Sequence, residues 1–85
     1  MEVTLKYFAW VRERVGIAEE KVLLPQSVAT VADTIAWLKR RGDNYASAFE
    51  RTEVIRAAVD RTHAALGASV VGSREIAFFP PITGG

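Results

Sequence analysis

The sequence contains no cysteine and only one histidine, His63. Without cysteine the chain can form neither a disulfide nor a cysteine-based metal site, and it has no thiol nucleophile. His63 has no second type of ligand at a useful spacing, so the sequence does not favour a metal site. Cysteine chemistry and disulfide cross-links are therefore excluded.

Excess charge and long hydrophobic runs are also missing. Eleven Lys and Arg stand against ten Asp and Glu, a net charge of +1 that gives no reason to expect nucleic acid or an anionic membrane as partner. No run approaches the roughly 18 apolar residues of a transmembrane helix, and no signal peptide is visible. A G-x-x-x-x-G-K-[ST] phosphate loop is absent. We expect a cytoplasmic protein with no cofactor of its own.

What is present is enough for one small folded domain. The chain has 85 residues, of which 49% are hydrophobic, an ordinary value for a globular protein. A domain of this size buries only about 60–65% of its unfolded surface, so we expect modest stability.

The first part of the chain predicts two strands joined by a short helix. Residues 2–8 alternate, with Val3, Leu5 and Tyr7 on one face and the aromatic Phe8 on the other. The next predicted elements are a helical turn at residues 9–15, which Gly16 ends in the left-handed conformation, and a strand at residues 20–24.

The clearest predicted helix covers residues 30–41. Thr30 is a good N-cap, and Asp33 supplies the acidic half of a capping box. One buried stripe is predicted at Val31, Ile35 and Leu38. The basic residues 39–41 lie in the last turn, where positive charge interacts favourably with the helix dipole. Gly42 is expected to stop the helix. Residues 42–44 are expected to form a loop and residues 45–51 a helical turn.

The second half predicts three more strands. Strand 54–60 places Ile55, Ala57 and Val59 inward, residues 62–65 suggest a return strand, and strand 74–79 alternates. In this last strand Ile76 and Phe78 face inward, and Ala77 and Phe79 face outward. One sheet covered by one helix is the natural two-layer solution. The pattern fits a β-grasp roll but leaves a ferredoxin-like alternative open.

The chain ends in an unusual segment, Pro80-Pro81-Ile82-Thr83-Gly84-Gly85. The two prolines prevent the strand from continuing, and the glycines carry no side chains. The five residues after Pro80 reach at most about 17 Å, enough to enter another protein's active site. We therefore expect a domain at residues 1–80 and an extended tail at residues 81–85. The free carboxylate of Gly85 is the strongest candidate for a reactive group, and we expect Gly84 to give it access to narrow sites; the alternative is a frayed chain end.

A docking surface is expected at the root of this tail. Phe8 and Phe79 lie on the outward faces of their strands and form one apolar patch if those strands are adjacent. Its remaining members are expected to be Pro80, Pro81, Ile82 and Thr83.

Both ends of the sequence resemble one known family. Residues 78–85, FFPPITGG, closely resemble the C-terminal signature of the small, sulfur-carrying subunit of molybdopterin synthase, and residues 5–16, LKYFAWVRERVG, resemble its N-terminal segment, including Arg12 and Glu13. The resemblance implies an α+β, ubiquitin-like β-grasp fold, a mixed sheet packed on one main helix. Its first and last strands are central, parallel neighbours.

The same resemblance implies a function and partners. An E1-like adenylating enzyme, using ATP, would activate Gly85, and a sulfurtransferase would supply the sulfur for a thiocarboxylate. The large catalytic subunit would then use this sulfur to convert a cyclic pterin precursor, in a two-plus-two complex. The small subunit is not catalytic alone. Because the chain lacks cysteine, its terminal carboxylate is the remaining plausible place for sulfur.

Two alternatives share the fold and the Gly-Gly ending. One is a ubiquitin-like protein modifier conjugated through Gly85. The other is the thiamine-pathway sulfur carrier, which does not typically have the Phe-Phe-Pro-Pro run. The sequence also departs from the resembled family at two turns. Residues 72–75 replace an Asp-Gly-Asp turn, and Val59-Asp60 replaces Val-Asn, which puts local turn geometry in doubt.

Overall fold

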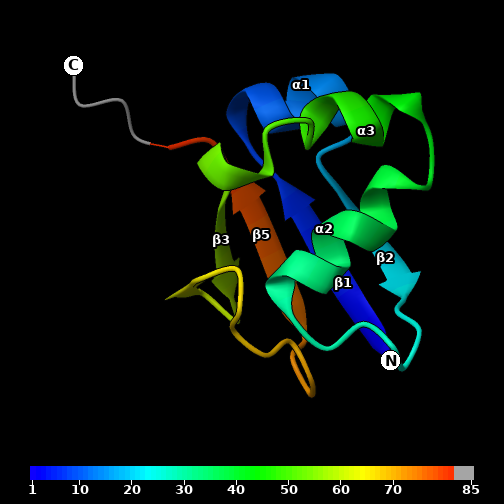
Figure 1. Cartoon of the computed structure of the whole chain (residues 1–85), viewed down its shortest axis with the longest axis vertical. Coiled ribbons are helices and arrows are strands. Elements are labelled where there is room, and N and C mark those ends of the chain that lie inside the picture. Colours follow the sequence, from blue (N-terminus) through cyan, green and yellow to red (C-terminus); the bar gives the residue numbers. More distant parts are fainter. Residues whose placement is uncertain (82–85) are drawn as a thin grey trace.

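The computed structural model describes residues 1–81 and shows a five-stranded mixed sheet with helices against one face and at one end (Figure 1). The expectations for Ile82, Thr83, Gly84 and Gly85 lie outside the described residues. The elements are, in chain order, β1 (Glu2–Tyr7), α1 (Ala9–Val15), β2 (Glu19–Leu23), α2 (Val31–Lys39), α3 (Asp43–Ala48), the 3₁₀ helix η1 (Thr52–Val54), β3 (Arg56–Val59), β4 (Thr62–Ala64) and β5 (Glu75–Phe79).

The first and last strands are neighbours at the centre of the sheet. The strand order is β2-β1-β5-β3-β4, and β1 and β5 run parallel with Leu5 opposite Ile76 and Tyr7 opposite Phe78. The other pairs are antiparallel. This confirms the expected central pair. It removes the ferredoxin-like alternative, because β1 and β2 are antiparallel partners and not the parallel strands of a βαβ unit.

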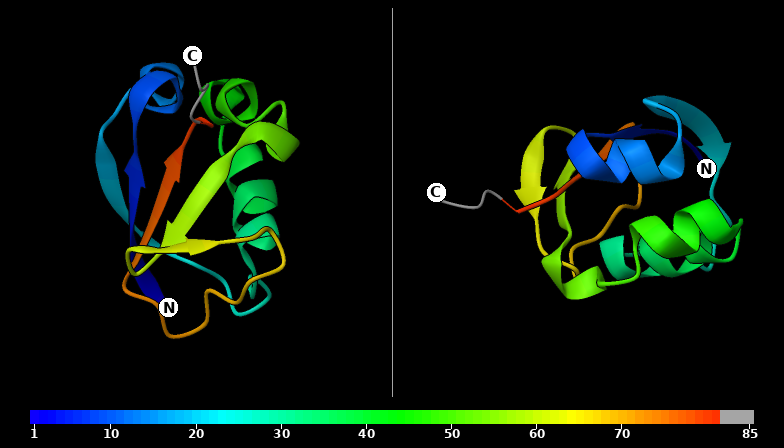
Figure 2. Two further views of the ribbon diagram at one scale, coloured as in Figure 1. Left: turned by 90° about the vertical axis from the view of Figure 1, so that its left-hand side faces the viewer. Right: turned by 90° about the horizontal axis from the view of Figure 1, so that it is seen from above.

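The core lies between the sheet and α2, which crosses the sheet in front of β1 and β5 (Figures 1 and 2). Leu5, Ile35 and Phe78 are 0%, 1% and 0% exposed, as their positions in the sequence predict. Alternation along β1 and β5 therefore sorts the side chains of the two central strands between the core and the open face.

The start of α2 follows the sequence prediction, whereas its end does not. Thr30 caps the helix because its hydroxyl oxygen accepts a hydrogen bond from the Asp33 amide, and the Asp33 carboxylate in turn accepts one from the Thr30 amide. The helix ends at Lys39, with Arg40 still in a right-handed conformation. Gly42 precedes α3, so the predicted loop at 42–44 is wrong. Burial of Tyr45 within α3 gives this short helix a tertiary anchor that the sequence pattern does not reveal.

The β3–β4 turn resolves the doubt about Val59-Asp60. Asp60 and Arg61 both have left-handed φ values, 48° and 69°, as in a type I′ hairpin turn. The Asp60 carboxylate accepts hydrogen bonds from the backbone amides of Arg74 at 2.9 Å and Glu75 at 3.0 Å. Asp60 therefore ties the hairpin to the beginning of β5.

None of the helices within residues 1–81 combines the length and the apolar character needed to cross a membrane.

Candidate functional site

The strand that leads to the C-terminal segment is fixed in an aromatic core. Phe78 stacks on Tyr7 with ring centroids 6.3 Å apart and meets Phe49 edge-on at 5.2 Å. β5 ends one residue later, and Pro80 and Pro81 are half-buried at the end of the sheet where α1 and α3 lie (Figure 1). We call this end of β5, with Pro80 and Pro81, the tail root. Because β5 is fixed in the core, it determines the direction in which Pro80 and Pro81 leave the sheet.

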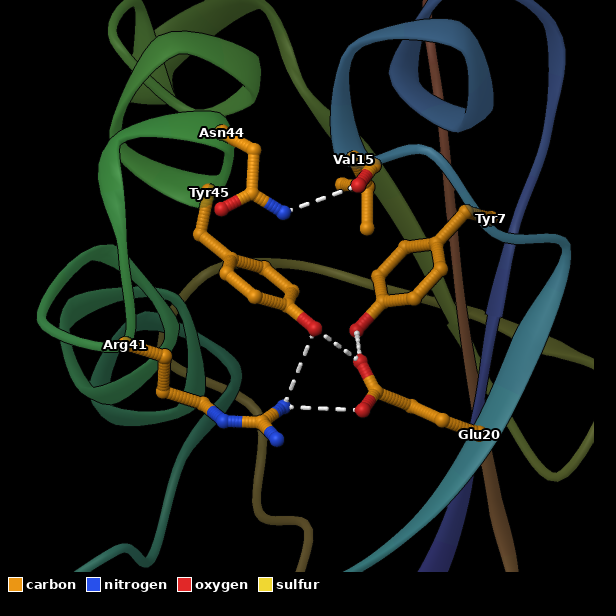
Figure 3. Close-up of polar contacts among 6 residues, drawn as sticks. All are labelled: Tyr7, Val15, Glu20, Arg41, Asn44 and Tyr45. Carbon is orange, nitrogen blue, oxygen red and sulfur yellow. Dashed lines mark hydrogen bonds and ion pairs between the residues drawn. The ribbon is translucent and has the colours of Figure 1, made fainter.

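A polar network binds the hydroxyl group of Tyr7, a member of the same aromatic core. One Glu20 oxygen accepts hydrogen bonds from the hydroxyls of Tyr7 at 2.9 Å and Tyr45 at 2.6 Å. The other accepts from Arg41 at 3.0 Å (Figure 3). In addition, the Asn44 amide group donates to the carbonyl of Val15 at 2.8 Å. These contacts attach α3 and the segment after α2 to the first two strands and to the end of α1.

The network changes the protonation of its members. Burial opposes ionisation of Glu20, but the hydroxyls of Tyr45 and Tyr7 and the Arg41 guanidinium outweigh it and hold the pKa of Glu20 below its ordinary 4.5. Burial, followed by the hydrogen bond to Glu20, raises the pKa of Tyr7 well above its ordinary value of 10.0. The same causes raise the pKa of Tyr45 to about 12. The arrangement stabilises a carboxylate between two neutral phenols, which is a structural role.

The two aromatic residues expected at the docking surface take different environments. Phe8 has extended backbone, donates its amide to the Phe78 carbonyl at 3.1 Å and is 49% exposed. Phe79 is half-buried, and its position is adjacent to that of Phe8 when the parallel register is continued by one residue. Ala77, the other residue expected to face outward, is only 7% exposed. The fold therefore brings Phe8 and Phe79 to the same end of the open sheet face.

Phe79 also borders a cavity that was not expected from the sequence. The His63 ring meets Phe79 edge-on at 5.5 Å, and Arg56 lies opposite Phe79 in the β3–β5 register. Together with Pro81 these residues line a cavity of about 250 Å³, which we call the tail-root cavity. The sequence could have predicted that Arg56 faces outward, because Arg56 alternates with the inward Ile55 and Ala57. It could not have predicted that Arg56 lies next to Phe79, because this depends on the order of the strands in the sheet.

The remaining charged candidates lie on the surface or in the polar network. Arg12 and Glu13 are exposed on α1. Of the basic residues 39–41, Arg41 does more than complement the helix dipole, because it binds Glu20 and lies over the rings of Trp37 and Tyr45. The network was missed because its members lie far apart in sequence. Within residues 1–81, no three His, Asp or Glu side chains are grouped so that they could hold a metal ion.

Comparison with known proteins finds a family and a relative that this chain resembles. The model of the ThiS family matches residues 5–85. The chain is 35% identical over 79 residues to the molybdopterin synthase sulfur carrier subunit of Haemophilus influenzae, a match that covers 93% of this chain and 94% of the relative.

Two solved structures are similar over the whole fold. SAMP1 from Haloferax volcanii has a TM-score of 0.73 and 26% identity, and the match covers 100% of both chains. The small archaeal modifier protein 1 from Methanosarcina acetivorans has a TM-score of 0.70 and 23% identity, with 99% of this chain and 96% of the other covered. The predicted ubiquitin-like β-grasp fold is confirmed.

Proposed function

The chain belongs to the ThiS family, and on that premise we propose that it is the sulfur carrier subunit of a molybdopterin synthase. The observation that carries this proposal is the 35% identity, over nearly the full length of both chains, to a relative of that name. The chain is then not an enzyme by itself but the sulfur-donating subunit of a complex.

The proposed carrier group is the carboxylate of Gly85. An ionised carboxylate is a poor electrophile, so it must first be activated. One carboxylate oxygen attacks the α-phosphorus of ATP, and pyrophosphate leaves. A sulfide-level sulfur nucleophile then attacks the carbonyl carbon of the acyl-adenylate, and AMP leaves. The resulting thiocarboxylate differs from the carboxylate by one sulfur in place of one oxygen. Its sulfur attacks a cyclic pterin precursor, and water then cleaves the bond between this sulfur and the acyl carbon, which returns Gly85 to a carboxylate.

The tail root supports this chemistry by positioning. Phe78 holds β5 in the core, so the two prolines leave the sheet in a fixed direction. Phe8, Phe79, Pro80 and Pro81 then form the docking surface, together with Ile82 and Thr83. Aromatic residues are enriched among the residues that dominate binding energy at interfaces. Gly84 lets the segment pass through a narrow channel.

The proposal requires three protein partners. They are the large catalytic subunit, an adenylating enzyme that supplies the ATP site, and a sulfurtransferase that provides sulfur. We place the assembly in the cytoplasm, with two small and two large subunits.

Removing Gly85 tests the proposal. Adenylation requires reacting atoms about 3–3.5 Å apart, and one residue fewer moves the last carbonyl back by about 3.3 Å. We expect loss of ATP–pyrophosphate exchange with the cognate adenylating enzyme, and no oxygen-to-sulfur change in the intact mass. The melting temperature should be unchanged, because β5 ends at Phe79, before the deleted residue.

Two further variants make this test specific. Glu19→Gln keeps the chain length, changes an exposed residue on β2 outside the docking surface and should react normally, whereas one residue added after Gly85 should block the reaction. If the chain without Gly85 is adenylated and accepts sulfur at the wild-type rate, it is not a carrier of this kind.

A second function is favoured by the similarity to SAMP1 from Haloferax volcanii, which is 26% identical to this chain. As a protein modifier, the chain would form an amide between Gly85 and a lysine of a target protein. The intact mass of protein isolated from its own cell separates the two functions. A carrier shows the oxygen-to-sulfur change, and a modifier appears in covalent adducts of high mass.

A further inference from the structure

The tail-root cavity combines apolar surface with a guanidinium and an imidazole side chain. Phe79 and Pro81 provide apolar surface, while Arg56 and His63 contribute nitrogen-bearing side chains from β3 and β4. A volume of about 250 Å³ is several times the roughly 30 Å³ that one water occupies, so a side chain of another protein fits. The cavity is part of the surface from which the C-terminal segment leaves.

The cationic group in this cavity is available for a partner. Lys6, on the same open face, is paired with Glu75 at 3.1 Å, and Arg41 is paired with Glu20. Within residues 1–81, Arg56 forms no ion pair, and it is exposed. A guanidinium binds a carboxylate through two parallel hydrogen bonds, a geometry that a single ammonium group does not provide.

From this arrangement we propose that the tail-root cavity receives an acidic side chain of the large catalytic subunit, and that Arg56 selects for it. The inference rests on the proposed function and adds the chemistry of the partner surface. The partner side chain places its carboxylate against Arg56, and its neighbours cover the exposed parts of Phe8 and Phe79. His63 packs edge-on against Phe79 and lines the same cavity. Charge complementarity at this position favours the correct partner and speeds its association.

The test is the affinity of the full chain for its cognate large subunit, measured by isothermal titration calorimetry at low and high salt. We expect Arg56→Gln to raise Kd at low salt by about fivefold or more, the factor that corresponds to about 1 kcal/mol. The variant should also reduce the salt dependence of Kd, because one cross-interface charge pair is lost. Arg56→Lys should retain part of the affinity.

Arg61→Gln is the matched control. It removes the same charge from an exposed arginine in the β3–β4 turn, at the opposite end of β3 from Arg56. We expect a change in Kd of less than about twofold, since isolated surface charges contribute little. Circular dichroism checks that each variant is folded.

Each other outcome has a definite meaning. Equal effects of Arg56→Gln and Arg61→Gln indicate general charge attraction and overturn the proposal. Tighter binding of Arg56→Gln also overturns it, because it indicates that the chain's own terminal carboxylate competes for the cavity. If the wild-type chain binds the large subunit and Arg56→Gln binds equally well, only the proposed acidic contact is wrong. If the wild-type chain does not bind, the proposed function fails, and this inference fails with it.

Discussion

Glu20 accepts three side-chain hydrogen bonds, which the sequence pattern of its own strand does not predict. Its carboxylate accepts from two phenols and one guanidinium, which come from β1, from α3 and from the residues after α2. Hydrogen bonds that involve an ionised group are roughly twice as strong as neutral ones. A single side chain on β2 therefore joins three separate parts of the fold.

Glu20→Gln should lower the free energy of unfolding by about 1–3 kcal/mol at pH 7, because partly buried donors lose a charged acceptor. Urea denaturation measures this change. Glu19→Gln is the control, since Glu19 is the exposed neighbour on the same strand. Equal losses in the two variants would contradict the structural role of the network.

The same variant should change the pH dependence of stability. The pKa of Glu20 is lowered below 4.5 in the folded chain, so the folded state binds this proton less readily than the unfolded state. Its stabilisation is complete above the unfolded pKa and is lost as the pH falls through the lower folded pKa. In Glu20→Gln the decline in stability below pH 4.5 should be shallower than in the wild type. The test is to measure unfolding midpoints of both proteins from pH 7 to pH 3. An equal change of stability with pH in the variant and the wild type would contradict the prediction.

Among the elements, the β3–β4 hairpin has a turn whose backbone geometry suits its second residue, Arg61, poorly. Both turn residues have left-handed φ, although neither is glycine. Asp60 compensates through its side chain, which binds two amides at the start of β5. No such side-chain hydrogen bond is formed by Arg61 within the described part of the chain.

Arg61→Gly should stabilise the protein by about 0.5–1 kcal/mol. Left-handed backbone costs an L-residue roughly 1–2 kcal/mol, which exceeds the roughly 0.5–1 kcal/mol of additional entropy that glycine loses on folding. The urea midpoint should rise without a change in slope. Arg61→Ala retains the left-handed cost and should not stabilise, so an equal gain in both variants would assign the effect to the lost charge.

For the molecule as a whole, one core supplies the stability. Leu5→Ala should lower the free energy of unfolding by about 2–5 kcal/mol, a large share of the total for a small domain. Leu23→Ala is the matched control, because it makes the same truncation at a side chain that is 72% exposed. Thermal unfolding of both variants should show a much larger decrease in melting temperature for Leu5→Ala.

The sequence predicted those parts of the fold that depend on local chemistry or on alternation. Thr30 and Asp33 predict the start of α2, and Leu5 and Phe78 predict the core face of their strands. It placed α3 only in part: it predicted a helical turn at residues 45–51, whereas the helix begins at Asp43, and the burial of Tyr45 depends on contact with Glu20, a residue on β2. For the candidate site, the outward aromatic residues followed from alternation. The position of Arg56 beside Phe79 required knowledge of which strands are neighbours.

The parallel pairing of β1 with β5 also constrains the order in which the protein can fold. Thr4 is paired with Glu75, so almost the whole chain must be closed into a loop before the centre of the sheet can form. Such long-range pairing slows folding, because the loop entropy is lost before the contacts compensate for it. A chain synthesised only as far as β4 leaves one edge of β1 without its partner. The domain can therefore complete its core only after the last strand, the one that leads to Gly85, has been made.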